Sequence, residues 1–113
     1  MDCLFCQIVN REIPGDIVFE DDEVLAFNDL NPQAPTHVLI IPKRHIATLN
    51  ELEEGDQALV GRLQLTAARL AKECGFADQG YRVVMNCNDL GGQTVYHIHM
   101  HLMGGRRFTW PAG

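Results

Sequence analysis

The sequence predicts an α+β fold, with a five-stranded antiparallel sheet packed against one long and one short helix. Three features predict it: short strand-like segments separated by turn residues, one long stretch of helical periodicity, and an alternating segment near the end of the chain. Tight connections between successive strands favour antiparallel pairing. A chain of 113 residues buries one hydrophobic core but not two, so we expect a single domain over residues 1–113.

A short helix precedes the first two strands. Leu4–Val9 mixes apolar and polar residues as a short helix does, and it ends before Pro14. Ile17–Glu20 and Val24–Phe27 are strand-like, and Asp21-Asp22 between them suits a tight turn. This pattern predicts a β-hairpin.

The middle of the chain holds a third strand and the long helix. Residues 28–35 form a loop with two prolines, and His37–Ile41 is a strand that Pro42 stops. From Asp56 to Cys74 apolar residues recur at helical spacing, and Gly75 ends the helix. Its small residues leave either a second apolar stripe open to another helix or one wide core face, and both explanations fit.

The last two predicted strands are Tyr81–Cys87 and Tyr96–Met103. In the second, three histidines occupy every second position: His97, His99 and His101. In a strand such residues point to one side, about 6.8 Å apart, whereas in a helix the middle one faces away from the others. The intervening residues then form a core face, which consists of Tyr96, Ile98, Met100 and Leu102.

The alternating histidines predict a catalytic or ligand-binding face. A neutral imidazole is a nucleophile near neutral pH when one ring nitrogen is held as a donor and the other is bare. Crowding and partial burial disfavour protonation of the rings, and a neighbouring ring can protonate a leaving group. The face therefore suits phosphoryl or nucleotidyl transfer through a phospho-histidine. Zinc chelation by histidines two apart is the serious alternative.

The segment before the histidines suits an anion. Gly91-Gly92-Gln93-Thr94 offers unobstructed backbone N–H groups, an amide and a hydroxyl. Two glycines also suit a plain turn, but their place directly before the histidine strand favours an anion site.

Charge and composition exclude several classes of protein. A net charge of −6 and a pI near 5.2 argue against a nucleic-acid-binding protein. The longest aliphatic run, Val38–Ile41, is too short to cross a bilayer, so we expect no membrane partner. The N-terminus lacks the features of a secretory signal. We therefore expect a cytoplasmic protein whose four cysteines are thiols or metal ligands.

The histidine segment also carries a family resemblance. His97-Ile98-His99-Met100-His101-Leu102-Met103 resembles the signature of the histidine triad superfamily, His-x-His-x-His followed by two apolar residues. Further landmarks span nearly the whole chain and resemble its nucleotide-binding branch: Asp29, Pro32-Gln33-Ala34-Pro35-Thr36-His37, Pro42-Lys43-Arg44-His45-Ile46, Gly91-Gly92-Gln93, Gly104-Gly105-Arg106 and Trp110-Pro111. In combination these motifs are highly specific.

The resemblance implies a fold, a partner and an activity. It implies a homodimer in which two five-stranded sheets join into one ten-stranded sheet, with the Trp110 tail near the partner subunit's active site. It implies a hydrolase that cleaves the P–N bond of purine nucleoside 5′-phosphoramidates, and related adenylates, through a nucleotidyl-histidine intermediate. No organic cofactor is expected.

Residue roles follow from the same resemblance. His99 is expected to be the nucleophile and His101 to contact the phosphate, while His97 supports the strand face and His37 orients the nucleophile. Thr94 stands where the branch often carries serine, so it keeps a hydroxyl but adds a methyl group that stiffens χ1. The expected nucleotide contacts are Asp29 at the ribose, Leu30 at the base, and Asn86, Gly92, Gln93, Thr94, His99 and His101 around the phosphate and leaving group. Without the resemblance, Asp29 is better explained as the cap of a turn.

The first cysteines form half of a metal site. Cys3-Leu4-Phe5-Cys6 also fits a redox motif, but the βαβ context of such motifs is absent. Some histidine triad proteins and hexose-phosphate uridylyltransferases bind zinc through Cys-x-x-Cys and two histidines. The resemblance thus implies a structural zinc on Cys3, Cys6, His45 and His97, which would leave His99 free.

A second class of function stays open, namely a nucleotide-binding regulatory or interaction module whose hydrolysis is incidental. Thr94, His37 and all three triad histidines are present, and a pure binding module does not require them all. A zinc metalloenzyme built on the three histidines is disfavoured, because the acidic residues lie elsewhere in the sequence.

Overall fold

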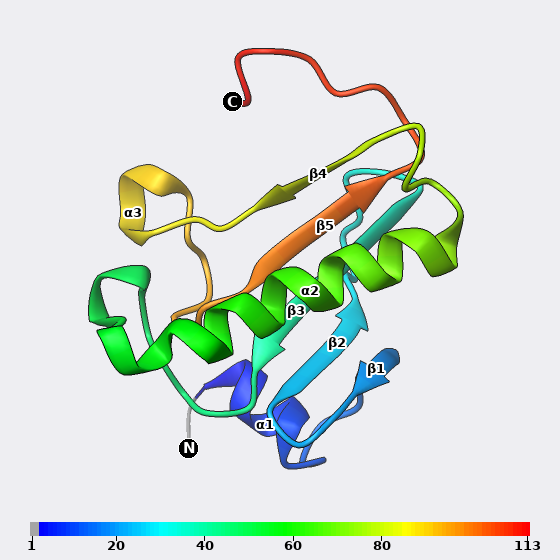
Figure 1. Ribbon diagram of the computed structural model, residues 1–113. Coiled ribbons are helices and arrows are strands. Elements are labelled where there is room, and N and C mark those ends of the chain that lie inside the picture. Colours follow the sequence, from blue (N-terminus) through cyan, green and yellow to red (C-terminus); the bar gives the residue numbers. More distant parts are fainter. Residues whose placement is uncertain (1–2) are drawn as a thin grey trace.

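The computed structural model describes residues 3–113 and contains one five-stranded antiparallel sheet of order β1-β2-β3-β5-β4 (Figure 1). The strands are β1 (Ile17–Glu20), β2 (Val24–Asn28), β3 (Thr36–Pro42), β4 (Tyr81–Val84) and β5 (Met100–Gly104). The helices are α1 (Leu4–Val9), α2 (Gln57–Cys74), α3 (Asn88–Gly91) and the 3₁₀ turns η1 (Leu49–Glu51) and η2 (Glu54–Asp56). The α+β prediction of five strands with one long helix is confirmed. No helix within residues 3–113 is long and apolar enough to cross a membrane.

The predicted hairpin of β1 and β2 is closed by the side chain of Asp21. Its Oδ1 accepts hydrogen bonds from the backbone N–H groups of Glu23 and Val24, both at 2.8 Å. Such a side-chain acceptor satisfies turn donors that have no partner in the ladder. The acidic turn thereby fixes the register next to the turn, where Glu20 pairs with Leu25, and an irregularity between Ile17 and Phe19 shifts the register further along.

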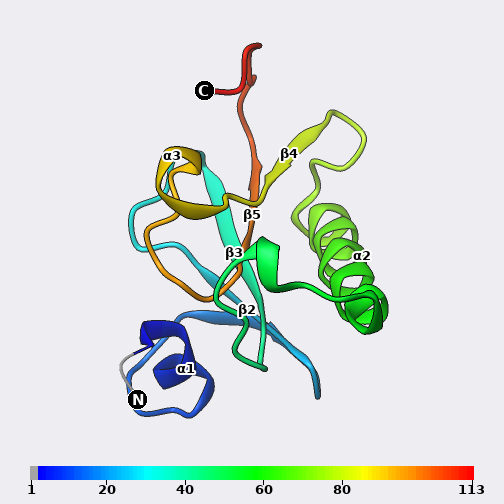
Figure 2. The same cartoon turned by 90° about the vertical axis from the view of Figure 1, so that its left-hand side faces the viewer.

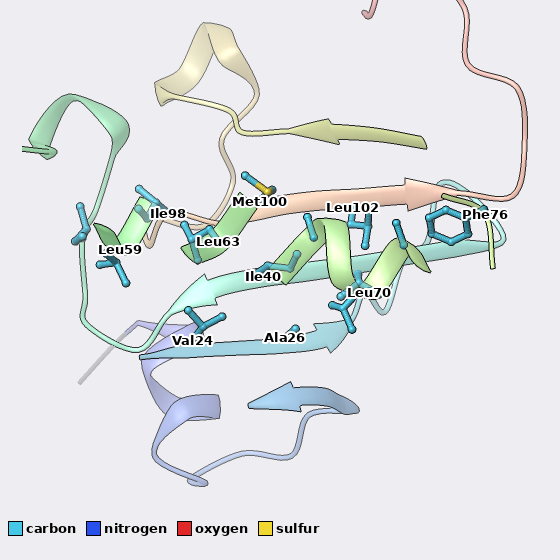
Figure 3. Packing of buried hydrophobic residues seen from close by; sticks show 14 residues of the cluster. Val24, Ala26, Ile40, Leu59, Leu63, Leu70, Phe76, Ile98, Met100 and Leu102 are labelled. Atoms are coloured by element: carbon cyan, nitrogen blue, oxygen red, sulfur yellow. The ribbon is translucent and has the colours of Figure 1, made fainter. Parts of the chain in front are cut away.

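Helix α2 covers one face of the sheet and encloses the larger core (Figure 3). Its buried residues are Leu59, Leu63, Thr66, Ala67, Leu70 and Ala71. Gly75, with φ of 88°, ends the helix in a left-handed conformation that suits glycine. Cys74 is exposed and a Cβ at Gly61 would meet no atom within 4 Å, so α2 has one core face, and no second helix of residues 3–113 covers its other side.

The opposite face of the sheet carries α1 (Figure 2). The histidines lie on the same side, where the ring of Phe5 in α1 contacts His97 and His99. Alternation along β3 sends Val38 and Ile40 toward α2, and Leu39 and Ile41 toward α1. The same alternation on β5 places Met100 and Leu102 under α2 and points His101 to the opposite face. The sheet thus separates a hydrophobic core from a polar face.

The strand predicted over Tyr96–Met103 begins only at Met100. The register that pairs Ile40 with Met100 would next place Ile98 opposite Pro42, which has no N–H to continue the ladder. The N–H of Ile98 instead donates to the Ile46 carbonyl over 2.8 Å. Tyr96 is 45% exposed, so its assignment to the core face was wrong.

The strand predicted over Tyr81–Cys87 ends early as well, at Val84. The connection that follows was predicted to offer an anion site, with no helix in it, but part of it forms the helical turn α3 (Asn88–Gly91). Gly92 closes that turn with φ of 86°.

Candidate active site

His37, His97 and His99 are buried on or beside the sheet face opposite α2, with 5%, 0% and 7% of their surface exposed. His37 comes from the start of β3, and His101 lies on β5, opposite Leu39 of β3. The ring centroids of His99 and His101 are 5.0 Å apart, and those of His37 and His101 are 5.1 Å apart. The predicted histidine face therefore exists, although only His101 of the triad lies within a regular strand.

A backbone carbonyl determines which nitrogen of His99 is bare. Nδ1 of His99 lies 2.8 Å from the His97 carbonyl oxygen. A carbonyl only accepts hydrogen bonds, so Nδ1 carries the hydrogen and Nε2 of the neutral ring keeps its lone pair. The ring of Phe5 packs edge-on against His99 at a centroid distance of 5.0 Å. Burial lowers the pKa of His99, which keeps the ring neutral and its Nε2 nucleophilic.

His37 and His101 form a second hydrogen-bonded pair with fixed tautomers. The backbone N–H of Gln33 donates to His37 Nδ1 over 3.0 Å, so the hydrogen of the neutral His37 ring is on Nε2. His37 Nε2 lies 2.9 Å from His101 Nδ1 and donates to it. The hydrogen of the His101 ring is therefore on Nε2. The site combines a bare nitrogen on His99 with an N–H on His101.

Burial is the main reason why these rings stay neutral. It lowers the pKa of His101 to about 4, with smaller contributions from the nearby His99 and His37 rings. It also lowers the pKa of His37, although Asp29 opposes the shift. The sequence analysis attributed the neutrality of these rings to both crowding and partial burial. Both contribute to the lowered pKa values, and burial is the larger effect.

A cluster of possible metal ligands includes the first histidine of the triad, His97. Sγ of Cys3 and Sγ of Cys6 lie 3.4 and 3.6 Å from His97 Nδ1, and His45 Nδ1 lies 3.3 Å from the same atom. A tetrahedral zinc with bonds of about 2.0–2.3 Å requires ligand atoms roughly 3.3–3.8 Å apart. The observed separations therefore match the edges of a zinc tetrahedron.

A hydrogen bond from one of the possible ligands, His97, supports the same interpretation. His97 Nε2 donates to the Pro42 carbonyl over 2.7 Å, which leaves Nδ1 bare and directed at the cysteines. Burial first, and then Cys3, raises the pKa of Cys6 to about 11 when no metal is present. A bound cation reverses such a shift because it stabilises the thiolate. Cys3, Cys6, His45 and His97 can thus hold a metal such as zinc.

A second group, Asp29, His37 and His101, also brings ligand atoms within 4.8 Å of one another. Its hydrogen bonds do not fit a metal. Nδ1 of His37 already accepts from the Gln33 N–H, so a metal on Nε2 would leave the ring without a hydrogen on either nitrogen. We interpret this group as a hydrogen-bond relay.

Asp29 has two separate contacts. Its Oδ1 accepts from the Asn31 N–H over 2.8 Å, which is the turn cap that the residue type alone suggests. Its Oδ2 lies 3.4 Å from His37 Nε2, so the carboxylate also borders the histidines. The neighbouring Leu30 is 98% exposed and contributes an apolar surface next to Asp29.

The loop over residues 88–94 is less open to an anion than predicted. The N–H groups of Gly92 and Gln93 donate to Asp89 and Asn88 carbonyls within the α3 turn, so they are not free as the sequence analysis expected. The Gln93 side chain is buried and bonded to three backbone groups, those of Ala47, Asn88 and Val95. Its role here is to hold the loop. Thr94 is exposed and Asn86 is half-buried.

A comparison with protein families identifies the family of the chain. The model of the HIT domain matches residues 10–108. This chain belongs to the HIT family. It is 53% identical over 103 residues to the purine nucleoside phosphoramidase of Escherichia coli, covering 91% of this chain and 87% of that protein.

Solved HIT structures agree with the fold. A HIT family hydrolase from Legionella pneumophila is 54% identical, with a TM-score of 0.98 over 99% of this chain and 100% of that one. A histidine triad nucleotide-binding protein from Candida albicans is 31% identical, with a TM-score of 0.83 over 99% of this chain and 85% of that one.

Three parts of this HIT site were missed by the sequence analysis. Phe5 shields His99, the Pro42 carbonyl orients His97, and the Gln33 N–H orients His37. Phe5 had a signal, because it lies inside the Cys-x-x-Cys segment already assigned to the site. The two backbone contacts had no such signal. The Pro42 carbonyl is far from His97 in the sequence, and a backbone N–H such as that of Gln33 occurs in nearly every residue.

The buried neutral histidines predict an acid-sensitive HIT fold. Their pKa values lie below the ordinary histidine value, so the unfolded chain binds more protons and stability is lost as pH falls from about 6.5 toward 4. We expect the Tm to fall by about 5–10 °C between pH 7 and pH 5. In His101→Asn, which cannot titrate, calorimetry should record a smaller fall. Equal slopes for both proteins would contradict this account.

Proposed function

We propose that this protein hydrolyses the P–N bond of purine nucleoside 5′-phosphoramidates and related adenylates through a nucleotidyl-histidine intermediate. The observation that carries the proposal is the pairing of a bare His99 Nε2 with an N–H on His101, both fixed by hydrogen bonds. The 53% identity to a purine nucleoside phosphoramidase supports the substrate class.

The first chemical step is attack by His99 on the α-phosphorus. A bond forms between Nε2 and phosphorus, the P–N bond breaks, and the amine departs with a proton from solvent, to which the water of the second step returns one. The His101 N–H donates to a phosphate oxygen as negative charge develops there. Water then attacks phosphorus, the bond to His99 breaks, and the nucleoside monophosphate leaves.

The remaining residues would bind and orient the nucleotide. We assign Asp29 to the ribose hydroxyls, because its carboxylate borders His37. We assign Leu30 to the base, because it follows Asp29 and exposes an apolar side chain. Thr94 supplies a hydroxyl to the phosphate or departing nitrogen, and Asn86 is assigned to the same part of the substrate. Gly92 and Gln93 act by holding this loop, since their N–H groups are already bonded.

The alternative function is a nucleotide-binding regulatory or interaction module with incidental hydrolysis. A binding module gains nothing from a nucleophile whose tautomer is fixed and whose pKa is held low. The hydrogen-bond relay from His37 to His101 therefore favours the enzyme.

We also propose a homodimer. Strand β4 is the last strand in the sheet order, so its outer edge is available to a second copy that would extend the sheet to ten strands. The C-terminal segment leaves the fold beside this strand (Figure 1). Its Trp110 is 84% exposed. A dimer through β4 would give this tail a partner, near that subunit's active site.

For the metal cluster we propose a structural zinc, which would hold α1 against the triad. The thiolates it requires persist in a reducing compartment, so we propose the cytoplasm as the site of action.

The test is a rapid-quench reaction of the wild-type protein with adenosine 5′-phosphoramidate. We expect release of AMP and ammonia, and a transient adenylyl group on His99 that mass spectrometry detects. Turnover without any adenylylated protein would contradict covalent catalysis. Binding of AMP without turnover would favour the regulatory module.

A further inference from the structure

The hydrogen bonds that fix His101 begin outside the site, at Arg106. Arg106 Nε donates to the Gln33 carbonyl oxygen over 2.9 Å. The N–H of the same residue, Gln33, donates to His37 Nδ1 over 3.0 Å, and His37 Nε2 lies 2.9 Å from His101 Nδ1. One loop residue therefore connects an arginine after β5 to the triad.

The Arg106 side chain is held in place although it is exposed. Its guanidinium lies 4.1 Å from the centroid of the Phe108 ring, and Nη1 donates to the Arg107 carbonyl over 3.1 Å. The preceding Gly105 has φ of 95°, and a Cβ there would lie 3.0 Å from Pro35 Cβ. Glycine thus lets the segment after β5 approach the loop over residues 29–35.

We propose that Arg106 is a positioning residue that determines the tautomers of His37 and His101 by fixing Gln33. Three other hydrogen bonds hold this loop, but none of them involves the Gln33 backbone: the Gln33 side chain donates to the Asn31 carbonyl, the Asn31 N–H donates to Asp29, and the Asp29 N–H donates to the His37 carbonyl. Once the Gln33 carbonyl loses the hydrogen bond from Arg106, the Gln33 backbone can rotate and turn its N–H away from His37. The hydrogen of His37 is then free to move to Nδ1, and His101 loses the donor that keeps its own hydrogen on Nε2.

The consequence for the proposed reaction is a weaker hydrogen bond to the phosphate in the transition state. We assign substrate binding to Asp29 and the loop over residues 88–94. Within residues 3–113, the Arg106 side chain has its hydrogen bonds and ring contact with Gln33, Arg107 and Phe108 instead. The effect is therefore expected in kcat rather than in KM. Only this kinetic part rests on the proposed function, because the tautomers can be observed without substrate.

The experiment compares Arg106→Met with Arg107→Met. Arg107 is also exposed and loses the same charge, but its side chain has no hydrogen bond, ion pair or ring contact within residues 3–113. Nitrogen-15 NMR of the histidine rings reports the tautomers. In Arg106→Met we expect His37 to change from the Nε2–H form to a mixture, and kcat for adenosine 5′-phosphoramidate to fall about tenfold, with KM changed less than about threefold.

Arg107→Met is expected to match the wild type in both measurements. Arg106→Lys keeps a cation near Phe108 and a donor within reach of Gln33, so it should restore much of the wild-type spectrum. Unchanged His37 and His101 signals in Arg106→Met, or equal losses in both methionine variants, would overturn the proposal. If the wild type lacks phosphoramidase activity, the proposed function fails while the NMR comparison still decides the role of Arg106.

Discussion

Replacing His99 with asparagine is expected to lower kcat/KM for adenosine 5′-phosphoramidate by at least about ten-thousandfold. The reason is that His99 Nε2 is the bare ring nitrogen beside the His101 N–H, so no other group replaces it as nucleophile. Asparagine retains an N–H for the His97 carbonyl and part of the volume against Phe5. Its Tm should therefore stay within a few degrees of the wild type, as circular dichroism would show.

His101→Ala is the matched comparison, because it removes a second histidine from the same face. It eliminates the donor to phosphate but leaves the nucleophile, and loss of one such donor typically costs about a hundred- to a thousandfold in kcat. Slow formation of the adenylylated intermediate should remain detectable in His101→Ala and be absent in His99→Asn. An intermediate in His99→Asn would show that another residue attacks phosphorus.

Local sequence patterns predict the parts of the fold that depend on neighbouring residues. The β1–β2 hairpin depends on the Asp21 turn, and α2 depends on apolar spacing and Gly75, so both were predicted with nearly correct bounds. The start of β5 was not predicted correctly, because it depends on which residue of β3 opposes Ile98. Pro42 is visible in the sequence as the end of β3, but its effect on β5 requires the register between distant strands.

The site also has features that residue types predict and features that depend on contacts between distant parts of the chain. The residue types and their alternation predict a histidine face, and the family resemblance predicts a cysteine–histidine metal cluster. The structure brings both sets of residues together. The tautomers depend on backbone groups such as the His97 and Pro42 carbonyls, which carry no side-chain signal. The role of Gln93 was obscured for a related reason, since an amide beside two glycines suits a phosphate as well as it suits loop carbonyls.

Removing one metal ligand is expected to have the largest effect on stability. Protein prepared without a histidine tag or chelator should contain about one zinc per chain, and Cys6→Ser close to none. If zinc is present at about a thousand times its Kd, binding adds about 4 kcal/mol to the stability of the folded state. For a domain of this size that corresponds to a Tm lower by about 10–20 °C in Cys6→Ser, measured by calorimetry alongside metal analysis.

Cys74→Ser is the matched control, because Cys74 is exposed and lies outside the metal cluster. It should keep its zinc and its Tm, whereas His45→Ala should lose metal as Cys6→Ser does. His97 joins the two sites, since its Nδ1 faces the cysteines while its carbonyl holds His99 Nδ1. Loss of zinc should therefore also reduce kcat while leaving the nucleophile in place. Metal-free wild-type protein with the Tm and kcat of the untreated protein would rule out a structural zinc.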